Sequence, residues 1–158
     1  MTSPAGIAPQ AEPGHYEQQG QDDADAAASG CRYRMAAAFA GMGIAAAPQE
    51  VPGSFCDGRF NLAVGGRKLV GTAQSWRRVG GVPAVLVHAV ILARCDTALL
   101  TERANAFEAA AGSERRYRAD ALTSVAQSWC DAHGQPSPPD DLHARLVGAL
   151  GAQFSCMI

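Results

Sequence analysis

Residues 54–74, SFCDGRFNLAVGGRKLVGTAQ, contain the strongest fold signal in the chain. Leu62 and Val64 alternate with Asn61 and Ala63, which is the pattern of a half-buried β-strand over residues 59–64. The Gly-Gly pair at 65–66 is typical of a two-residue hairpin turn, and residues 67–74 predict the returning strand. The stretch therefore predicts a β-hairpin whose second strand contains Lys68.

The sequence on either side of this hairpin predicts one more strand and several helices. A second Gly-Gly pair at 80–81 precedes the apolar run 83–93, PAVLVHAVILA, which predicts a long strand covered on both faces. The alanine-rich segment 31–43 predicts a helix, and helical patterns recur over 96–111, 120–133 and 140–154. The element order predicts the α+β class, with an antiparallel or mixed sheet and flanking helices.

Residues 1–30 differ from the rest in composition. They contain five acidic residues and no Lys or Arg, and their large apolar side chains beyond Met1 are limited to Ile7 and Tyr16. Such a segment cannot bury enough apolar surface to offset its chain entropy, so we expect it to be disordered. The predicted organisation is a disordered tail over 1–30 and one domain over 31–158.

The bulk properties exclude several classes of protein. The net charge of −2 makes nucleic acid an unexpected partner. The longest apolar run is too short to span a bilayer, so we expect no membrane partner. The five cysteines form no CxxC pair and the histidines lack metal-ligand spacing, so no metal site is expected. Without a secretory signal, reduced thiols predict a cytoplasmic protein.

Lys68 is the candidate for chemistry because it is the single lysine beside 12 arginines. Its compact ammonium follows a Gly-Gly turn and precedes the small residues Gly71, Thr72 and Ala73. Glycine inside a strand often marks the close approach of a ligand or another backbone. A cation beside a narrow groove suits a phosphate or adenylate-like anion. The alternative is an ordinary edge hairpin with a solvated lysine.

The run NLAVGGRKLVGTAQ over 61–74 resembles the Asp-Leu-x-Val-x-Gly-Arg-Lys-Ile-x-Gly-Ser-Ala-Gln core of lipoate–protein ligase A and the related octanoyltransferases and biotin–protein ligases. The downstream run RRVGG over 77–81, followed by VHAVIL over 87–92, also fits. The resemblance extends over about residues 51–94 and weakly to about 155. It implies part of a class II synthetase-like catalytic domain, namely its C-terminal half.

The resemblance implies an activity and a set of site residues. Family enzymes bind lipoate or octanoate with ATP and Mg²⁺, form an acyl-adenylate, and pass the acyl group to a lysine of a lipoyl carrier domain. Such carriers belong to 2-oxoacid dehydrogenases and the glycine cleavage system.

Lys68 matches the family lysine that contacts the acyl-adenylate or the acyl carbonyl, and Asn61 takes the place of an Asp in the substrate site. Gly71, Thr72 and Ala73 match the wall of the groove, and His88 matches a family histidine, although a purely structural histidine remains an alternative.

Two further features of the resemblance leave alternatives open. Cys56 lies close to the cysteine that forms a thioester in octanoyltransferases, so a Cys56-dependent transferase competes with the ligase, while an inert thiol is the default. Family members also place an Arg-Arg-x-x-Gly-Gly-Gly loop and several strands in an N-terminal half that closes the pocket, and residues 1–30 cannot replace it. We therefore expect a complementary half or a homodimer, or else a non-catalytic remnant.

Overall fold

The computed structural model describes residues 13–56, 58 and 60–155. The elements in chain order are α1 (Pro13–Gly41), β1 (Ala47–Pro48), β2 (Leu62–Val64), β3 (Arg67–Val79), β4 (Val82–Ile91), α2 (Thr97–Ala110), the short 3₁₀ helix η1 (Ala119–Ala121), α3 (Val125–His133) and α4 (Leu142–Phe154). Within this part of the chain the strands form one antiparallel sheet in the order β1-β2-β3-β4. The predicted α+β class, with an antiparallel sheet and flanking helices, is confirmed.

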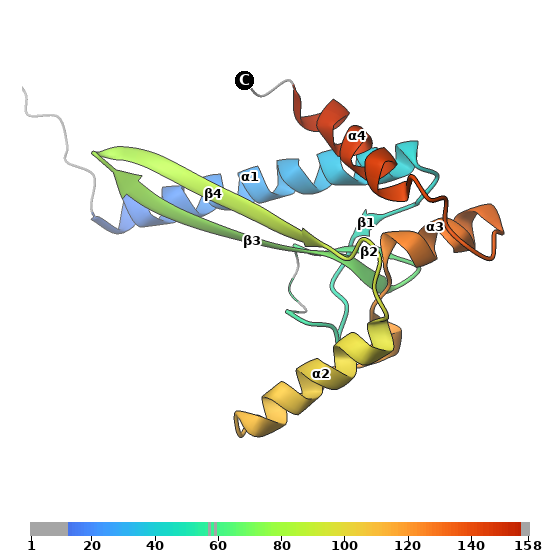
Figure 1. Ribbon diagram of the computed structural model, residues 1–158. Coiled ribbons are helices and arrows are strands. Elements are labelled where there is room, and N and C mark those ends of the chain that lie inside the picture. The colour runs from blue at the N-terminus through green and yellow to red at the C-terminus, as the bar shows by residue number, and fades with distance from the viewer. Residues whose placement is uncertain (1–12, 57, 59, 156–158) are drawn as a thin grey trace, which may run out of the picture.

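The long hairpin of β3 and β4 dominates the sheet, and α1 runs beside it (Figure 1). Both predicted Gly-Gly turns are confirmed, with φ values of 55° and 76° at Gly65 and Gly66, and 58° and 84° at Gly80 and Gly81. Positive φ at both central residues gives the turn a twist that matches the flanking strands. Strand β3 extends five residues further than the sequence predicts, to Val79.

The start of α1 differs from the sequence-based expectation. Residues 13–30, which we expected to be disordered, form the first part of a 29-residue helix, while residues 1–12 lie outside the described residues. Small residues make this packing feasible: Ala24 and Ala28 are buried, and a Cβ at Gly20 would overlap the Trp76 indole of β3. Asp25 also accepts a hydrogen bond from Gln74 over 3.1 Å. The small residues at 20, 24 and 28 therefore let this part of the helix lie close to its neighbours in the fold.

The main core lies at the base of the hairpin. Phe39 near the end of α1 and Ile44 just after it pack with Leu62, Leu69 and Val70 of the sheet. The same core includes residues of α3 and α4, namely Val125, Ala126, Leu142 and Leu146. This packing fixes the start of β3, where Lys68 lies, while the far end of the hairpin extends beyond the core.

The outer part of β4 corrects a prediction. The strand was expected to be covered on both faces, but Val82, Leu86 and Val90 are 64%, 61% and 62% exposed. These residues have the same parity along the strand and share one face of the hairpin, opposite the face against which α1 packs. Strand β4 is also the last strand of the sheet. The described chain thus leaves an apolar face and a sheet edge open.

Candidate functional site

Lys68 is directed into the site by an irregularity between β2 and β3. Ala63 pairs with Lys68 but Leu62 pairs with Val70, so one step on β2 corresponds to two steps on β3 and Leu69 is the extra residue. Such a bulge changes the face to which the neighbouring side chains point. It brings Lys68 onto the face of Gly71, where a Cβ on residue 71 would lie 3.2 Å from both Cε and Nζ of the lysine.

The bulged backbone is held from two sides. Thr123 N donates to the Lys68 carbonyl over 2.9 Å, and Leu92 N donates to the Leu69 carbonyl over 3.2 Å. Paired carbonyls on both residues prevent the buried bulge from leaving unsatisfied polar groups. The position of Lys68 therefore depends on β4 and on the segment before α3 as well as on its own hairpin.

The Lys68 ammonium is buried rather than solvated. The residue is 6% exposed, and its Nζ donates to the carbonyl oxygens of Phe55 and Cys56, the latter over 2.8 Å. Asn61 Nδ2 donates to the same Cys56 oxygen over 2.9 Å. The alternative of a solvated edge lysine is wrong, and burial makes any anion placed beside this ammonium interact more strongly than in water.

The loop that caps Lys68 is itself anchored. Phe55 packs edge-on against Tyr117, with ring centroids 4.7 Å apart, and Tyr117 Oη donates to Glu108 over 2.6 Å. This hydrogen bond raises the pKa of Tyr117 and lowers the pKa of Glu108. Cys56 has a φ of 46°, a left-handed conformation that is uncommon outside glycine and costs free energy. The loop thus holds its two carbonyls toward the lysine at some conformational cost.

A cavity of about 280 Å³ brings most of the predicted site residues together. This volume lies near the lower end of the range for small-molecule pockets, roughly 300–1,000 Å³. Six of the seven predicted residues line it: Cys56, Lys68, Gly71, Thr72, Ala73 and His88. The other described residues in the lining are apolar, namely Phe55, Leu69, Val90, Leu92 and Leu122. The seventh residue, Asn61, is buried and contacts the site through the Cys56 carbonyl.

The cavity floor follows directly from the strand register. Ala73 faces His88 and Gly71 faces Val90 in the β3–β4 ladder, so these four residues share one face of the hairpin. Small residues on β3 leave the space, while β4 supplies an imidazole and an apolar side chain. The Thr72 hydroxyl also donates to the Phe60 carbonyl and so tethers the loop before β2. The roles of these residues in binding or catalysis stay predictions.

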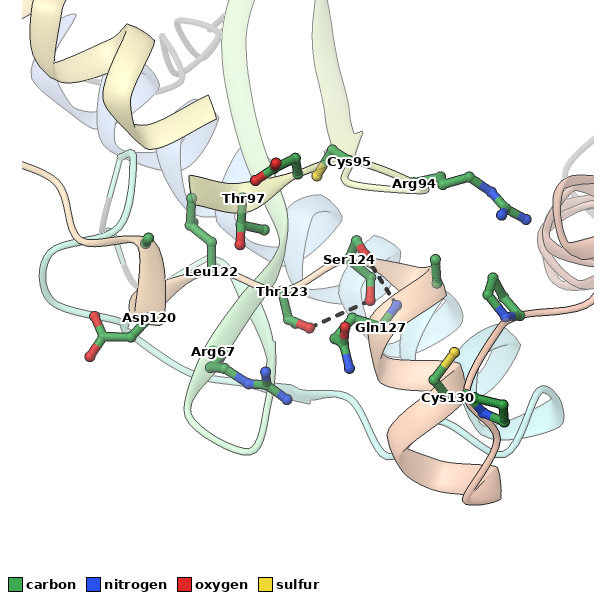
Figure 2. A pocket seen from close by; sticks show the side chains of 15 residues that line it. Arg67, Arg94, Cys95, Thr97, Asp120, Leu122, Thr123, Ser124, Gln127 and Cys130 are labelled. Carbon is green, nitrogen blue, oxygen red and sulfur yellow. Dashed lines mark hydrogen bonds between the residues drawn. The ribbon is translucent and has the colours of Figure 1, made fainter. Parts of the chain in front are cut away.

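A larger cavity of about 700 Å³ lies between the start of α2 and the start of α3 (Figure 2). None of the predicted site residues lines it. The backbone donors at the start of α3 are already used: Val125 N bonds Leu92 O over 2.7 Å and Ala126 N bonds Ala93 O over 3.0 Å. Arg67, on its wall, is paired with Asp131 over 2.6 Å and lowers the pKa of that carboxyl by hydrogen bonding. At the start of α2, Ala98 N and Leu99 N both donate to the Asp96 carboxylate. Because these backbone donors are already used, the smaller cavity is the better candidate.

The sequence did not predict the contacts that hold the site. The bulge at Leu69 arises from a register shift between β2 and β3. The capping loop over Phe55–Cys56 lies at least 12 positions before Lys68 in the sequence. One signal was available, namely Gly71, which we expected to face a ligand or a backbone. The group that approaches it is the Lys68 side chain.

Comparisons with known proteins found two similar sequences. The chain is 44% identical over 103 residues to the uncharacterized protein H16_B0148 of Cupriavidus necator. This match covers 58% of the chain and 41% of the relative. It is 41% identical over 82 residues to octanoyl-GcvH:protein N-octanoyltransferase of Kyrpidia tusciae, covering 48% of this chain and 28% of the relative. No family model matches the chain. The chain thus shares a segment with an octanoyltransferase and spans less than half the length of either relative.

Two further observations concern metals and membranes. In residues 13–56, 58 and 60–155, no group of three or more His, Cys, Asp or Glu side chains is placed to hold a metal ion. Across the same residues, none of the helices is both long and apolar enough to cross a bilayer.

Proposed function

We propose that this chain takes part in the transfer of an octanoyl or lipoyl group to a lysine of a lipoyl carrier domain. The observation that carries the proposal is the mostly apolar cavity beside the buried ammonium of Lys68, with the exposed Cys56 among its lining residues. An apolar cavity accommodates an acyl chain, and a buried cation stabilises negative charge on an acyl oxygen. The match to an N-octanoyltransferase supports the same class of reaction.

Of the two mechanisms that the sequence left open, we favour transfer through a thioester on Cys56. Cys56 is exposed and lines the cavity together with Lys68. Its sulfur attacks the acyl carbonyl of the donor, an S–C bond forms, the donor's bond to the acyl carbon breaks, and the thiol proton goes to the leaving group. The amine of the acceptor lysine then forms the new N–C bond, and the sulfur leaves with a proton from that amine.

Lys68 has an electrostatic role in this scheme. Negative charge develops on the acyl oxygen in both steps, and a preorganised cation in a water-poor site lowers the free energy of such a transition state. The ammonium already lies against the peptide carbonyl of the nucleophile. The acyl oxygen would therefore compete with the Phe55 and Cys56 carbonyls for the same donor.

The ligase alternative requires ATP and Mg²⁺, and the cavity residues fit these groups poorly. Mg²⁺ is usually bound by one or two carboxylates together with phosphate oxygens. Among the described residues that line the cavity none is a carboxylate, and position 61 is an amide. A ligase would have to take these ligands from outside the described lining of the cavity, so we derive no step through them.

The open hairpin face supports a second polypeptide in the complete site. The apolar side chains of Val82, Leu86 and Val90 continue from the cavity along the same face of β4. A complementary half that adds strands to β4, or a second copy of the chain, would cover this surface and enclose the acyl group. The carrier domain would then be the acceptor rather than a permanent partner.

The test is acyl capture by the chain, alone and with the remaining segment of a relative added in trans. Incubation with an octanoylated carrier should give a hydroxylamine-sensitive octanoyl adduct on Cys56, followed by transfer to an unmodified carrier. Cys56→Ser should abolish the adduct, whereas Cys95→Ser, which alters another exposed thiol, should not. The proposal is wrong if neither form of the protein yields an adduct or an acylated carrier.

A further inference from the structure

The chain buries an amide beside its single lysine. Asn61 is 2% exposed and lies directly before β2. Its Nδ2 and the Lys68 Nζ donate to one acceptor, the Cys56 carbonyl oxygen, over 2.9 Å and 2.8 Å. The Oδ1 atom of Asn61 lies 3.9 Å from the point where a Cβ on residue 71 would be. Asn61, Cys56, Lys68 and Gly71 therefore form one connected group.

The bond from Asn61 requires an amide. A carbonyl oxygen has two lone pairs and can accept from both nitrogens at once. A carboxylate has no hydrogen to donate, so Asp at this position, which is usual in the family that the sequence resembles, could not hold the Cys56 carbonyl. It would also place a negative charge near the ammonium and lower the ability of that ammonium to attract another anion. An amide adds no such charge.

The second contact requires a glycine. A Cβ on residue 71 would lie 3.2 Å from both Cε and Nζ of Lys68, closer than ordinary van der Waals contact. The φ of Gly71 lies outside the left-handed range, so the backbone itself accepts alanine. The lysine end is flexible and can move by a few tenths of an ångström. An added methyl group would therefore displace the ammonium and leave the strand intact.

We propose that Asn61 and Gly71 are positioning residues for Lys68. Asn61 fixes the Cys56 carbonyl as the resting acceptor of the ammonium without adding negative charge, and Gly71 leaves the space through which the lysine side chain reaches that carbonyl. The catalytic meaning of this arrangement rests on the proposed acyl transfer. The arrangement itself can be tested without any transfer activity.

Because Lys68 is the single lysine, amine labelling of the chain reports directly on the reactivity of this side chain. The chain is treated with a limiting amine reagent across a pH range, and peptide mass spectrometry separates Lys68 from the terminal amine. We expect Asn61→Asp to raise the pH of half-maximal Lys68 labelling by about one unit, because a neighbouring carboxylate stabilises the protonated amine. Asn61→Ala should not raise this pH, although it should speed labelling at least threefold, since the capping carbonyl is no longer held.

Gly71→Ala provides an independent test that does not depend on a buried polar substitution. We expect it to change the Lys68 labelling rate at least threefold and to lower acyl transfer, while the melting temperature stays equal or rises because alanine is less flexible than glycine. The matched control is Gly148→Ala in α4, where a Cβ would meet nothing within 4 Å. It should leave both labelling and transfer unchanged.

The outcomes separate the two proposals. If Asn61→Asp and Gly71→Ala both leave the labelling profile of Lys68 at the wild-type values, the positioning role is refuted, whatever the transfer activity. If the labelling changes as expected but no form of the protein transfers an acyl group, the positioning role stands and the proposed function fails.

Discussion

Filling the cavity at Ala73 should shorten the acyl chain that the site accepts. Ala73 lines the cavity on β3 and faces His88 across the hairpin. Leucine at this position adds three carbons to a space of about 280 Å³, so we expect it to displace about three methylene groups of an octanoyl chain. At about 0.8 kcal/mol per buried methylene, the loss is about 2.4 kcal/mol, or about 50-fold in kcat/KM.

The assay compares octanoyl and pentanoyl donors in one competition, with acylated carrier measured by intact mass. The Ala73→Leu variant should lose about 50-fold with the octanoyl donor and little with the pentanoyl donor, which is three carbons shorter. Ala144→Leu in α4 is the matched control, because residue 144 is exposed and lies outside both the cavity and the open hairpin face. Equal losses for both chain lengths, or a similar loss in the control, would refute the assignment of this cavity to the acyl chain.

Three predictions concern the stability and association of the chain. Asp131→Asn should cost less than about 1 kcal/mol at pH 7, because its pair with Arg67 is exposed. Since the pKa of Asp131 is lowered, that contribution is present above the unfolded-state pKa of about 3.9 and is lost as the pH falls through the lower folded-state pKa. Urea denaturation should thus show a difference in stability between wild type and variant at pH 7 that disappears near pH 2. Phe39→Ala should destabilise the protein by about 3–5 kcal/mol in the same assay, because the ring is fully buried in the core, and a cost under 1 kcal/mol would contradict that packing. Leu86→Lys should reduce concentration-dependent association in size-exclusion chromatography with little change in stability, and a wild-type chain that elutes as a monomer at all concentrations would argue against the open hairpin face as an interface.

The sequence predicted the parts of the fold that depend on local rules. Both Gly-Gly turns are where hairpin geometry requires positive φ, and the three C-terminal helices follow the helical patterns downstream of the hairpin. The two failures have a common cause. The apolar run of β4 and residues 13–30 at the start of α1 were judged by composition. Composition does not say whether a face is covered or how closely a helix of small residues can approach a sheet.

In the candidate site, too, the features set by local sequence were predictable and those set by tertiary packing were not. The resemblance identified Lys68 and the small residues after it, and the hairpin register brings Ala73 and His88 together as a consequence of the turn at Gly80-Gly81. The burial of the lysine could not be predicted, because it depends on the bulge at Leu69 and on a loop carbonyl 12 residues upstream. Such contacts depend on tertiary packing and leave no periodic signal in the sequence.

The most direct test of the account is photo-crosslinking with an octanoyl analogue that carries a diazirine at the end of its chain. If the cavity beside Lys68 holds the acyl group, saturable crosslinks should map to its apolar lining, such as Leu92 and Leu122, and unlabelled octanoate should compete with them. Crosslinks that do not saturate, or that map to Val82 and Leu86 on the open hairpin, would show that the chain binds the analogue as a general apolar surface and would contradict the account.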